Sequence, residues 1–189
     1  MTRILTLASA SPRRKQLLEM LGLPIRVEPA HIPEALLPRE SPLAYSKRLA
    51  REKARAVSGE FVLGADTIVV LDDHLMEKPL DVEDAVRMLT LLQGRTHEVI
   101  SSVALAHGGK DEVRTDITKV TFRSADEAFL RAYIATGEPM DKSGAYGIQG
   151  YGAALVERVE GDFFGVMGLP VRLVLQLLDQ AGWGYRFTR

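Results

Sequence analysis

A long apolar run at residues 61–71 constrains the fold of this chain more than any other feature of its sequence. It reads Phe-Val-Leu-Gly-Ala-Asp-Thr-Ile-Val-Val-Leu, and its branched and aromatic side chains predict a buried strand. Helical and strand patterns alternate along the chain on both sides of this run, which indicates an α/β or α+β domain. A chain of 189 residues can bury one substantial core, or two lobes around a cleft.

Helix start signals recur along the chain. Serine followed by proline predicts a helix with the serine as N-cap and the proline in its first turn. Such pairs occur at residues 11–12 and 41–42. Further helix starts are predicted at Asp81, at a capping box formed by Ser124 and Glu127, and at Pro170.

Shorter strand signals lie between these helices. Strands are expected at residues 4–7, 99–105, 113–122 and 155–159, with turns at Asp72-Asp73 and Gly108-Gly109. Because helices join some strands and hairpins join others, we expect a mixed sheet flanked by helices. The sequence contains no repeat or linker, so we expect a single domain over residues 1–189.

The composition excludes several kinds of site. The chain has no cysteine, which excludes disulfides, iron–sulfur clusters and thiolate zinc sites. Its histidines lack the spacing of a metal site, so we expect exposed or hydrogen-bonded side chains at His31, His74, His97 and His107. No stretch approaches the roughly 20 apolar residues that a membrane span requires, and the N-terminus lacks the apolar core of a signal peptide. We therefore expect a soluble, unprocessed, cytoplasmic protein.

Charge is unevenly distributed, although the formal net charge is only −1. Residues 1–60 carry eleven Lys and Arg against six Asp and Glu. This excess of positive charge indicates either a local anionic ligand or a solvated charged face, and the count leaves both open.

The first candidate site lies at residues 7–14, Leu-Ala-Ser-Ala-Ser-Pro-Arg-Arg, where a strand ends and a helix begins. Cations in the first turn oppose the helix dipole, so Arg13 and Arg14 fit this position best when an anion is bound. Backbone N–H groups, the Ser9 hydroxyl and the two guanidinium groups would together suit a phosphate. The alternative is a well-capped helix with solvated arginines.

Asp66 is the second candidate, because it is the one acid within the apolar run. Burying a carboxylate is costly unless it is paired or binds a metal, and Gly64 allows a ligand or another backbone to approach closely. Such a carboxylate can hold a divalent cation or accept a proton from an attacking water. The alternative is a structural aspartate paired with a buried lysine or arginine.

The third candidate is Lys78, in the segment Glu-Lys-Pro at residues 77–79 that follows the first predicted turn. If this segment folds back along the strand, Lys78 returns towards Asp66. It would then either form an ion pair with Asp66 or bind a phosphate while Asp66 holds a metal.

The fourth candidate is a glycine-rich segment at residues 141–150, Asp-Lys-Ser-Gly-Ala-Tyr-Gly-Ile-Gln-Gly. It matches neither the Walker A loop nor G-x-G-x-x-G. Glycines permit positive φ angles and close backbone approach. The amide of Gln149 offers a donor beside an acceptor, which matches the N3–H and carbonyl edge of uracil or thymine. The alternative is a purely structural loop.

Together these segments resemble the Maf family of nucleoside triphosphate pyrophosphatases, historically described as septum-formation inhibitors. The matching segments keep the family order and are residues 7–18, 49–54, 64–67, 77–79, 141–150 and 168–170. The resemblance covers nearly the whole chain and implies an α/β fold of the inosine-triphosphatase type, with two lobes around a cleft. It also implies a homodimer.

The resemblance implies a reaction as well, the hydrolysis of dTTP and UTP to the monophosphate and pyrophosphate, extending to modified pyrimidine triphosphates. In family terms Asp66 matches the proton acceptor, and Arg13, Thr67 and Gln149 match positions linked to substrate choice. The Ile-Gln-Gly ending at residues 148–150 resembles the dTTP/UTP subgroup, as opposed to members that act on 7-methyl-GTP. Such an enzyme would limit the incorporation of modified nucleotides and influence cell division.

From the residues and the resemblance together, we expect Mg²⁺ or Mn²⁺ held by Asp66 and Glu34 with the triphosphate oxygens. The expected phosphate-binding residues are Ser9, Arg14, Lys53 and Lys78. The sequence departs from the family at residues 31–34, where His-Ile-Pro-Glu replaces an acidic cluster and only Glu34 remains as a metal ligand. Ser143 and Gly165 replace residues that are commonly alanine and asparagine.

Two rival functions remain open. The first is a non-enzymatic regulator of septum formation that binds nucleotide or nucleic acid, for which the basic helix predicted after residue 41 is the best feature. The second is a purine-directed pyrophosphatase on the same fold. A buried Asp66 counts against the regulator, because pure nucleic-acid binders rarely need one. As a partner we expect a small-molecule triphosphate, with neither a stable nucleic-acid complex nor a membrane.

Overall fold

The computed structural model describes residues 3–187. Its strands are β1 (Leu5–Leu7), β2 (Ile25–Val27), β3 (Phe61–Leu71), β4 (His74–Met76), β5 (Thr96–His107), β6 (Lys110–Phe122) and β7 (Val156–Glu160). Its helices are α1 (Pro12–Met20), α2 (Pro42–Arg55), α3 (Val82–Leu92), α4 (Glu127–Ile134), α5 (Phe163–Met167) and α6 (Val171–Gln180). Short 3₁₀ segments follow α4 at η1 (Glu138–Asp141), η2 (Ser143–Ala145) and η3 (Tyr151–Leu155). Within residues 3–187, no helix combines the length and the apolar character needed to cross a bilayer.

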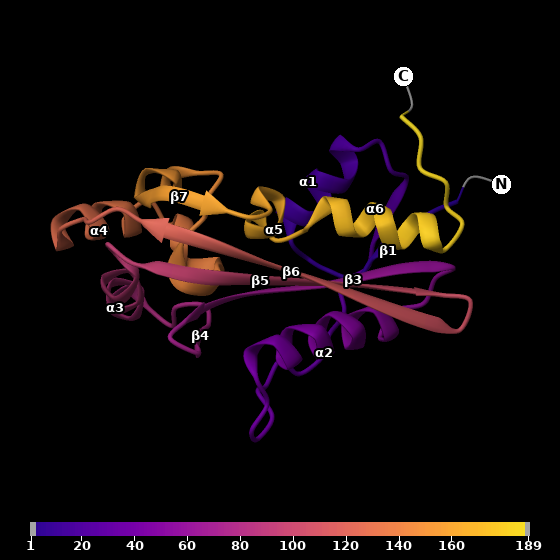
Figure 1. Cartoon of the computed structure of the whole chain (residues 1–189), viewed down its shortest axis with the longest axis horizontal. Coiled ribbons are helices and arrows are strands. Elements are labelled where there is room, and N and C mark those ends of the chain that lie inside the picture. The colour runs from indigo at the N-terminus through magenta and orange to yellow at the C-terminus, as the bar shows by residue number, and fades with distance from the viewer. Residues whose placement is uncertain (1–2, 188–189) are drawn as a thin grey trace. The chain divides into compact units, whose positions relative to one another are not determined.

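One mixed sheet contains all seven strands, and Figure 1 follows them along the chain by colour. The strand order is β2-β1-β3-β5-β6-β7, with β4 paired to β3. Strand β1 runs parallel to both β2 and β3, while β4 is antiparallel to β3 and β7 is antiparallel to β6. Parallel pairs with helical crossovers and antiparallel hairpins thus occur together, and the predicted fold class, a mixed sheet flanked by helices, is confirmed.

The chain divides into two compact units that share strands. Among the described residues, unit 1 holds those up to Asp66, Ser101–Asp116, and those from Gly168 onward. Unit 2 holds Thr67–Ile100 and Ile117–Met167. Each of β3, β5 and β6 belongs partly to one unit and partly to the other. The single domain over residues 1–189 and the cleft between two lobes stay predictions.

In unit 1, α2 begins where the sequence predicts it, at Ser41-Pro42. The Ser41 hydroxyl accepts a hydrogen bond of 3.3 Å from the backbone N–H of Ala44, which satisfies one of the free donors at the helix start. Figure 1 shows α2 and α6 on opposite sides of the strands of this unit. The central strands are therefore covered on both faces, as the apolar sequence of β3 requires.

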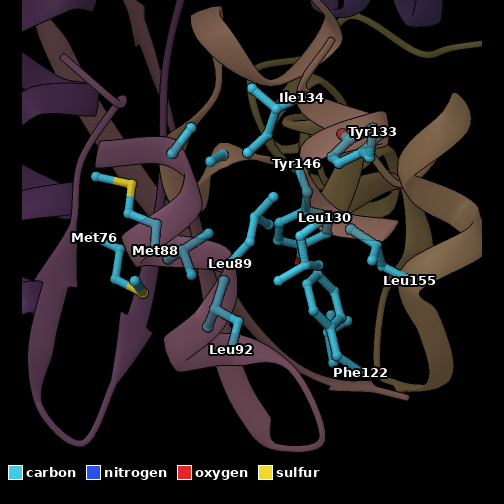
Figure 2. Close-up of a cluster of buried hydrophobic side chains, with 14 of the residues drawn as sticks. Met76, Met88, Leu89, Leu92, Phe122, Leu130, Tyr133, Ile134, Tyr146 and Leu155 are labelled. Carbon is cyan, nitrogen blue, oxygen red and sulfur yellow. The ribbon is translucent and has the colours of Figure 1, made fainter. Parts of the chain in front are cut away.

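Unit 2 is built around a buried cluster contributed by α3, α4 and the strand ends, with the glycine-rich segment inserted among them. Figure 2 shows side chains of α3, such as Leu89, and of α4, such as Leu130, gathered around Tyr146. The Tyr146 ring meets Phe122 edge-on, with centroids 4.7 Å apart. Ile148, two residues further on, is 5% exposed. The glycine-rich segment is thus anchored by its own apolar side chains.

The start of α4 differs from the prediction. Asp126, and not Ser124, is the N-cap, because its carboxylate accepts a 2.8 Å hydrogen bond from the N–H of Phe129. Aspartate caps a helix as well as serine does, so the S-x-x-E pattern indicates the wrong one of two candidates that stand two positions apart. Strand β2 and helix α5 lie outside the predicted elements, and each is too short to show a clear period.

Candidate active site

Asp66 lies on β3 and is buried, with 5% of its surface exposed. Its Oδ1 accepts a hydrogen bond of 2.9 Å from the Nζ of Lys53, which is itself 7% exposed on α2. The same ammonium contacts Glu34 Oε1 at 2.9 Å. A buried carboxylate is tolerated when it is paired and hydrogen-bonded, and Lys53 provides both. The pairing given above as the structural alternative for Asp66 is therefore present, with Lys53 as the partner.

The second oxygen of Asp66 has a different environment. Asp66 Oδ2 is buried and has no hydrogen-bond partner among residues 3–187. Native proteins rarely leave a buried acceptor unpaired, and such atoms commonly mark a catalytic group or the place of a water or ion. Oδ2 can accept a proton from a water molecule or coordinate a divalent cation. The ion pair with Lys53 thus occupies Oδ1 and leaves Oδ2 available for chemistry.

Small residues bring Lys53 within reach of Asp66. Gly64 is two residues before Asp66 and shares its face of β3. A Cβ at position 64 would lie 2.1 Å from the backbone oxygen of Ala50 and 2.5 Å from the backbone nitrogen of Ala54. Since Ala50, Lys53 and Ala54 lie on one face of α2, this close approach of helix and strand delivers the ammonium to the carboxylate.

The turn from β1 into α1 is held by side chains of that turn. Ser9 Oγ accepts hydrogen bonds from the N–H of Ser11 at 3.2 Å and from Arg14 Nη1 at 3.0 Å. Arg14 Nε also donates to the backbone oxygen of Gly168 at 2.9 Å. A serine hydroxyl that accepts two hydrogen bonds keeps its own O–H as a donor. Ser9 and Arg14 therefore form a fixed pair of donors at the N-terminus of α1.

The charges of this group act on one another. Burial lowers the pKa of the Arg14 guanidinium, and the carboxylates of Asp66 and Glu34 partly offset that effect, while the neighbouring charge of Arg13 adds to it. Arg14 nevertheless remains a cation, as arginine does throughout the accessible pH range. Of the predicted site residues, unit 1 thus brings together Ser9, Arg13, Arg14, Glu34, Lys53 and Asp66.

The remaining predicted residues belong to unit 2. Ser143 Oγ donates a 3.3 Å hydrogen bond to the backbone oxygen of Thr67, the residue after Asp66. The N–H of Gly144 donates to the backbone oxygen of Glu77 at 3.1 Å. The glycine-rich segment is therefore bonded both to β3 and to the residue before Lys78. The Lys78 side chain is exposed, and the ion-pair partner of Asp66 is Lys53.

His97 is a buried histidine next to the glycine-rich segment. It is 2% exposed, and its Nε2 shares a 2.9 Å hydrogen bond with the hydroxyl of Tyr146. Its Nδ1 has no partner in the described part of the chain. The predicted hydrogen-bonded side chain at His97 is therefore hydrogen-bonded at one of its two ring nitrogens. Burial lowers the pKa of His97 to about 4, so the ring is neutral at neutral pH.

Unit 1 contains two carboxylates that are suited to hold a divalent cation. Mg²⁺ is commonly held by one or two protein carboxylates and completed by substrate phosphates and water. Asp66 and Glu34 fit that description, because they contact the same ammonium and Asp66 offers the unpaired Oδ2. Within residues 3–187, no three His, Asp or Glu side chains are grouped closely enough to hold a metal ion.

Comparison with known proteins decides the family. The family described as Maf-like protein matches residues 4–181. The chain belongs to the Maf family. The match runs through both units, and all nine candidate residues of the Maf site lie inside it.

Relatives of this Maf chain carry the name dTTP/UTP pyrophosphatase. The relative from Koribacter versatilis (strain Ellin345) is 50% identical over 182 residues, covering 94% of each chain. The relative from Chromobacterium violaceum is 49% identical over 186 residues, again covering 94% of each chain. A relative from Anaeromyxobacter dehalogenans (strain 2CP-1) is 46% identical over 189 residues, which is 98% of this chain and 97% of the relative.

Proposed function

We propose that this chain is a nucleoside triphosphate pyrophosphatase that hydrolyses dTTP and UTP to the monophosphate and pyrophosphate. The observation that carries the proposal is the buried Asp66, whose Oδ1 is fixed by Lys53 and whose Oδ2 has no partner among the described residues. A carboxylate held in place by one oxygen and unpaired at the other suits a general base. The relatives named above, at 46–50% identity over nearly their full length, support the substrate.

The proposed reaction needs a base and a set of cations. A water oxygen forms a bond to the α-phosphorus, the bond from that phosphorus to the bridging oxygen breaks, and pyrophosphate leaves. Asp66 Oδ2 accepts the proton that the water loses. Ser9, Arg14, Lys53 and Lys78 bind phosphate oxygens and stabilise the charge that develops on them. Positioning and electrostatic stabilisation are the main sources of catalysis in transfers of this kind.

The proposal includes a divalent cation, Mg²⁺ or Mn²⁺. Asp66 and Glu34 would hold it, and the unpaired Oδ2 of Asp66 supports this choice. When bound, the cation supplies neutralisation of negative charge on the triphosphate. Lys53 contacts both carboxylates and orients them whether or not the cation is bound.

The ion pairs on the basic face of α2 argue against the rival function, a regulator that binds nucleic acid. Arg48 pairs with Glu40 at 2.7 Å, and Arg51 and Arg55 both pair with Asp111, at 2.6 Å and 2.5 Å. A protein that binds phosphodiesters through counterion release needs such cations to be available. We propose instead a cytoplasmic homodimer that acts on a small-molecule triphosphate and forms no stable complex with nucleic acid.

The experiment that tests the function is phosphate release from a panel of nucleoside triphosphates with Mg²⁺ or Mn²⁺, with and without added inorganic pyrophosphatase. We expect phosphate from dTTP and UTP only in the coupled reaction, because cleavage between the α and β phosphates yields pyrophosphate. Release without the coupling enzyme would indicate cleavage at the γ-phosphate. Preference for purine triphosphates would support the purine-directed rival, and inactivity on every triphosphate would overturn the enzyme.

Base choice is proposed to depend on Gln149, with Arg13 and Thr67 contributing to substrate choice. Replacing Gln149 with glutamate keeps the size of the side chain but removes its N–H donor. Uracil presents a carbonyl where cytosine presents an amino group, so the variant should favour CTP over UTP relative to the wild type. We expect the UTP/CTP ratio of kcat/KM to fall about tenfold or more, while kcat changes within about twofold.

The matched control for this substitution is Gln176→Glu, at an exposed position on α6. It introduces the same charge in unit 1, whereas Gln149 belongs to unit 2, and should leave the UTP/CTP ratio unchanged. An unaltered ratio in Gln149→Glu would refute the base-reading role of Gln149.

A further inference from the structure

The carboxylate of Glu138 is surrounded by hydrogen-bond donors of the glycine-rich region. Its Oε2 accepts from the N–H of Tyr151 at 2.8 Å, and its Oε1 accepts from the N–H of Gly152 at 2.9 Å. Tyr151 is the first residue of η3. Glu138 thus caps the backbone immediately after Gln149 and Gly150 with two charge-assisted hydrogen bonds.

Tyr133 extends this network to the other side of Gln149. Its hydroxyl donates to Glu138 Oε1 at 2.9 Å and accepts from the N–H of Gly147 at 3.1 Å. Tyr133 lies on α4 and is 6% exposed, so its ring position is fixed by the core of unit 2 (Figure 2). We call residues 147–152 the Gln149 loop. Glu138 and Tyr133 together bind it at both ends.

The glycines of the Gln149 loop fit around this network. A Cβ at Gly150 would lie 2.0 Å from Glu138 Oε2, and a Cβ at Gly152 would lie 2.7 Å from the Tyr133 hydroxyl. Neither residue has a positive φ angle. Glycine permits both positive φ angles and close approach of other groups. At these two positions the structure shows close approach, by the Glu138 carboxylate at Gly150 and by both the Tyr133 hydroxyl and the Gly147 backbone at Gly152.

Glu138 is ionised at neutral pH. Burial raises the pKa of its carboxyl, but hydrogen bonds from Gly152, Tyr151 and Tyr133 and the charge of Lys142 together lower it below its usual value. Burial and the neighbouring Glu138 raise the pKa of Tyr133, so its hydroxyl stays protonated. The ionised Glu138 carboxylate therefore accepts, and the protonated Tyr133 hydroxyl donates to it, as the hydrogen bonds of the network require.

We propose that Glu138, acting with Tyr133, is a positioning residue for base recognition, because it fixes the backbone on both sides of Gln149. The proposal rests on the base-reading role proposed for Gln149. Within the loop, Ile148 is buried and Gln149 is exposed. The core, Tyr133 and Glu138 therefore hold the backbone of the loop, while the side chain that is to meet the base is exposed. A preorganised backbone lets that amide discriminate without first being ordered by the substrate.

The signal for Glu138 in the sequence is weak. It stands three residues before the glycine-rich segment, and no spacing rule connects it to Tyr151 or connects Tyr133 to Gly147. The contacts arise because η1 packs against η3 and α4. Both residues are therefore found from the structure alone.

The test compares Glu138→Gln with the wild type in steady-state kinetics on UTP and CTP. Glutamine keeps the shape but places an NH₂ group against a backbone N–H, so one end of the loop is released. We expect KM for UTP to rise about tenfold, kcat to change within about twofold, and the UTP/CTP ratio of kcat/KM to fall. Tyr133→Phe, which removes the hydroxyl only, should show a smaller shift in the same direction and carries the test if Glu138→Gln does not fold.

Glu83→Gln is the matched control, because Glu83 is an exposed carboxylate of unit 2 paired with Arg131. It should leave KM and the UTP/CTP ratio unchanged. Amide hydrogen exchange of a peptide covering residues 147–152 should become faster in Glu138→Gln and not in Glu83→Gln. Equal losses of kcat on both substrates, or a folded Glu138→Gln with wild-type KM and ratio, would overturn the proposal. Wild-type protein without triphosphate activity would instead overturn the proposed function, and hydrogen exchange would still report on the loop.

Discussion

Replacing Asp66 with asparagine should lower kcat for dTTP and UTP by about a thousandfold, within the range by which general bases contribute to catalysis. The substitution is nearly isosteric, and the amide oxygen can still accept the hydrogen bond from Lys53 that Oδ1 accepts now. The amide nitrogen then stands where Oδ2 is unpaired, and it cannot accept a proton. Steady-state kinetics with the pyrophosphatase-coupled assay measures the effect, and thermal unfolding shows whether the variant is folded.

Asp111→Asn provides the matched control. Asp111 is also a carboxylate of unit 1 with basic partners, Arg51 and Arg55, but its ion pairs are exposed and it is not among the candidate site residues. Its replacement should leave kcat within about twofold of the wild type, because only surface ion pairs are lost. If Asp66→Asn kept more than a tenth of the wild-type kcat while remaining folded, Asp66 would not be the base.

The second large effect is expected from Gly64→Ala. The added Cβ would lie 2.1 Å from the oxygen of Ala50, which is backbone and cannot rotate away. Helix α2 must then move off β3, and overpacking of this kind should lower the free energy of unfolding by about 3 kcal/mol. For a chain of this size the corresponding fall in Tm is about 10 °C. Activity should fall as well, because the same movement withdraws Lys53 from Asp66.

Two comparisons separate crowding from other causes of instability. Gly109→Ala places a methyl group in open space but at a φ of +74°, so it should cost only about 1 kcal/mol. Adding Ala54→Gly to Gly64→Ala should not restore stability, since the closest obstacles are backbone atoms of α2. Urea unfolding of the four proteins measures these differences. If Gly64→Ala were as stable as Gly109→Ala, α2 could move away from β3 with little loss in the free energy of unfolding.

Local patterns were sufficient where a structure is determined by neighbouring residues. The apolar run at residues 61–71 predicts β3 with the bounds observed, and Ser11, Ser41 and Asp81 cap the helices that follow them. Each cap is a hydrogen bond to a residue three positions further on, and the strand is marked by the apolar side chains of its own residues. The prediction of Ser124 as the N-cap of α4 was wrong, because Ser124 and Asp126 both satisfy the local rule for a cap and only packing selects one of them.

The partner of Asp66 illustrates what local patterns do not contain. The sequence draws attention to Lys78, which follows a hairpin turn and so returns towards the strand. The observed partner, Lys53, lies 13 positions before Asp66 on a helix. Its proximity depends on how closely α2 approaches β3, and Gly64 permits that distance only once both elements have formed. Pairing between elements is a tertiary property, so the residue types were predictable and the pairing was not.

The route of the backbone through the two units limits how this protein can be divided. The chain passes from one unit to the other at four points, after Asp66, Ile100, Asp116 and Met167. The first three points lie inside β3, β5 and β6. Any single cut leaves pieces of unit 1 on both sides, so no gene fragment with one new end encodes either unit apart from the other. Recombination between relatives can therefore exchange a complete unit only through several simultaneous crossovers.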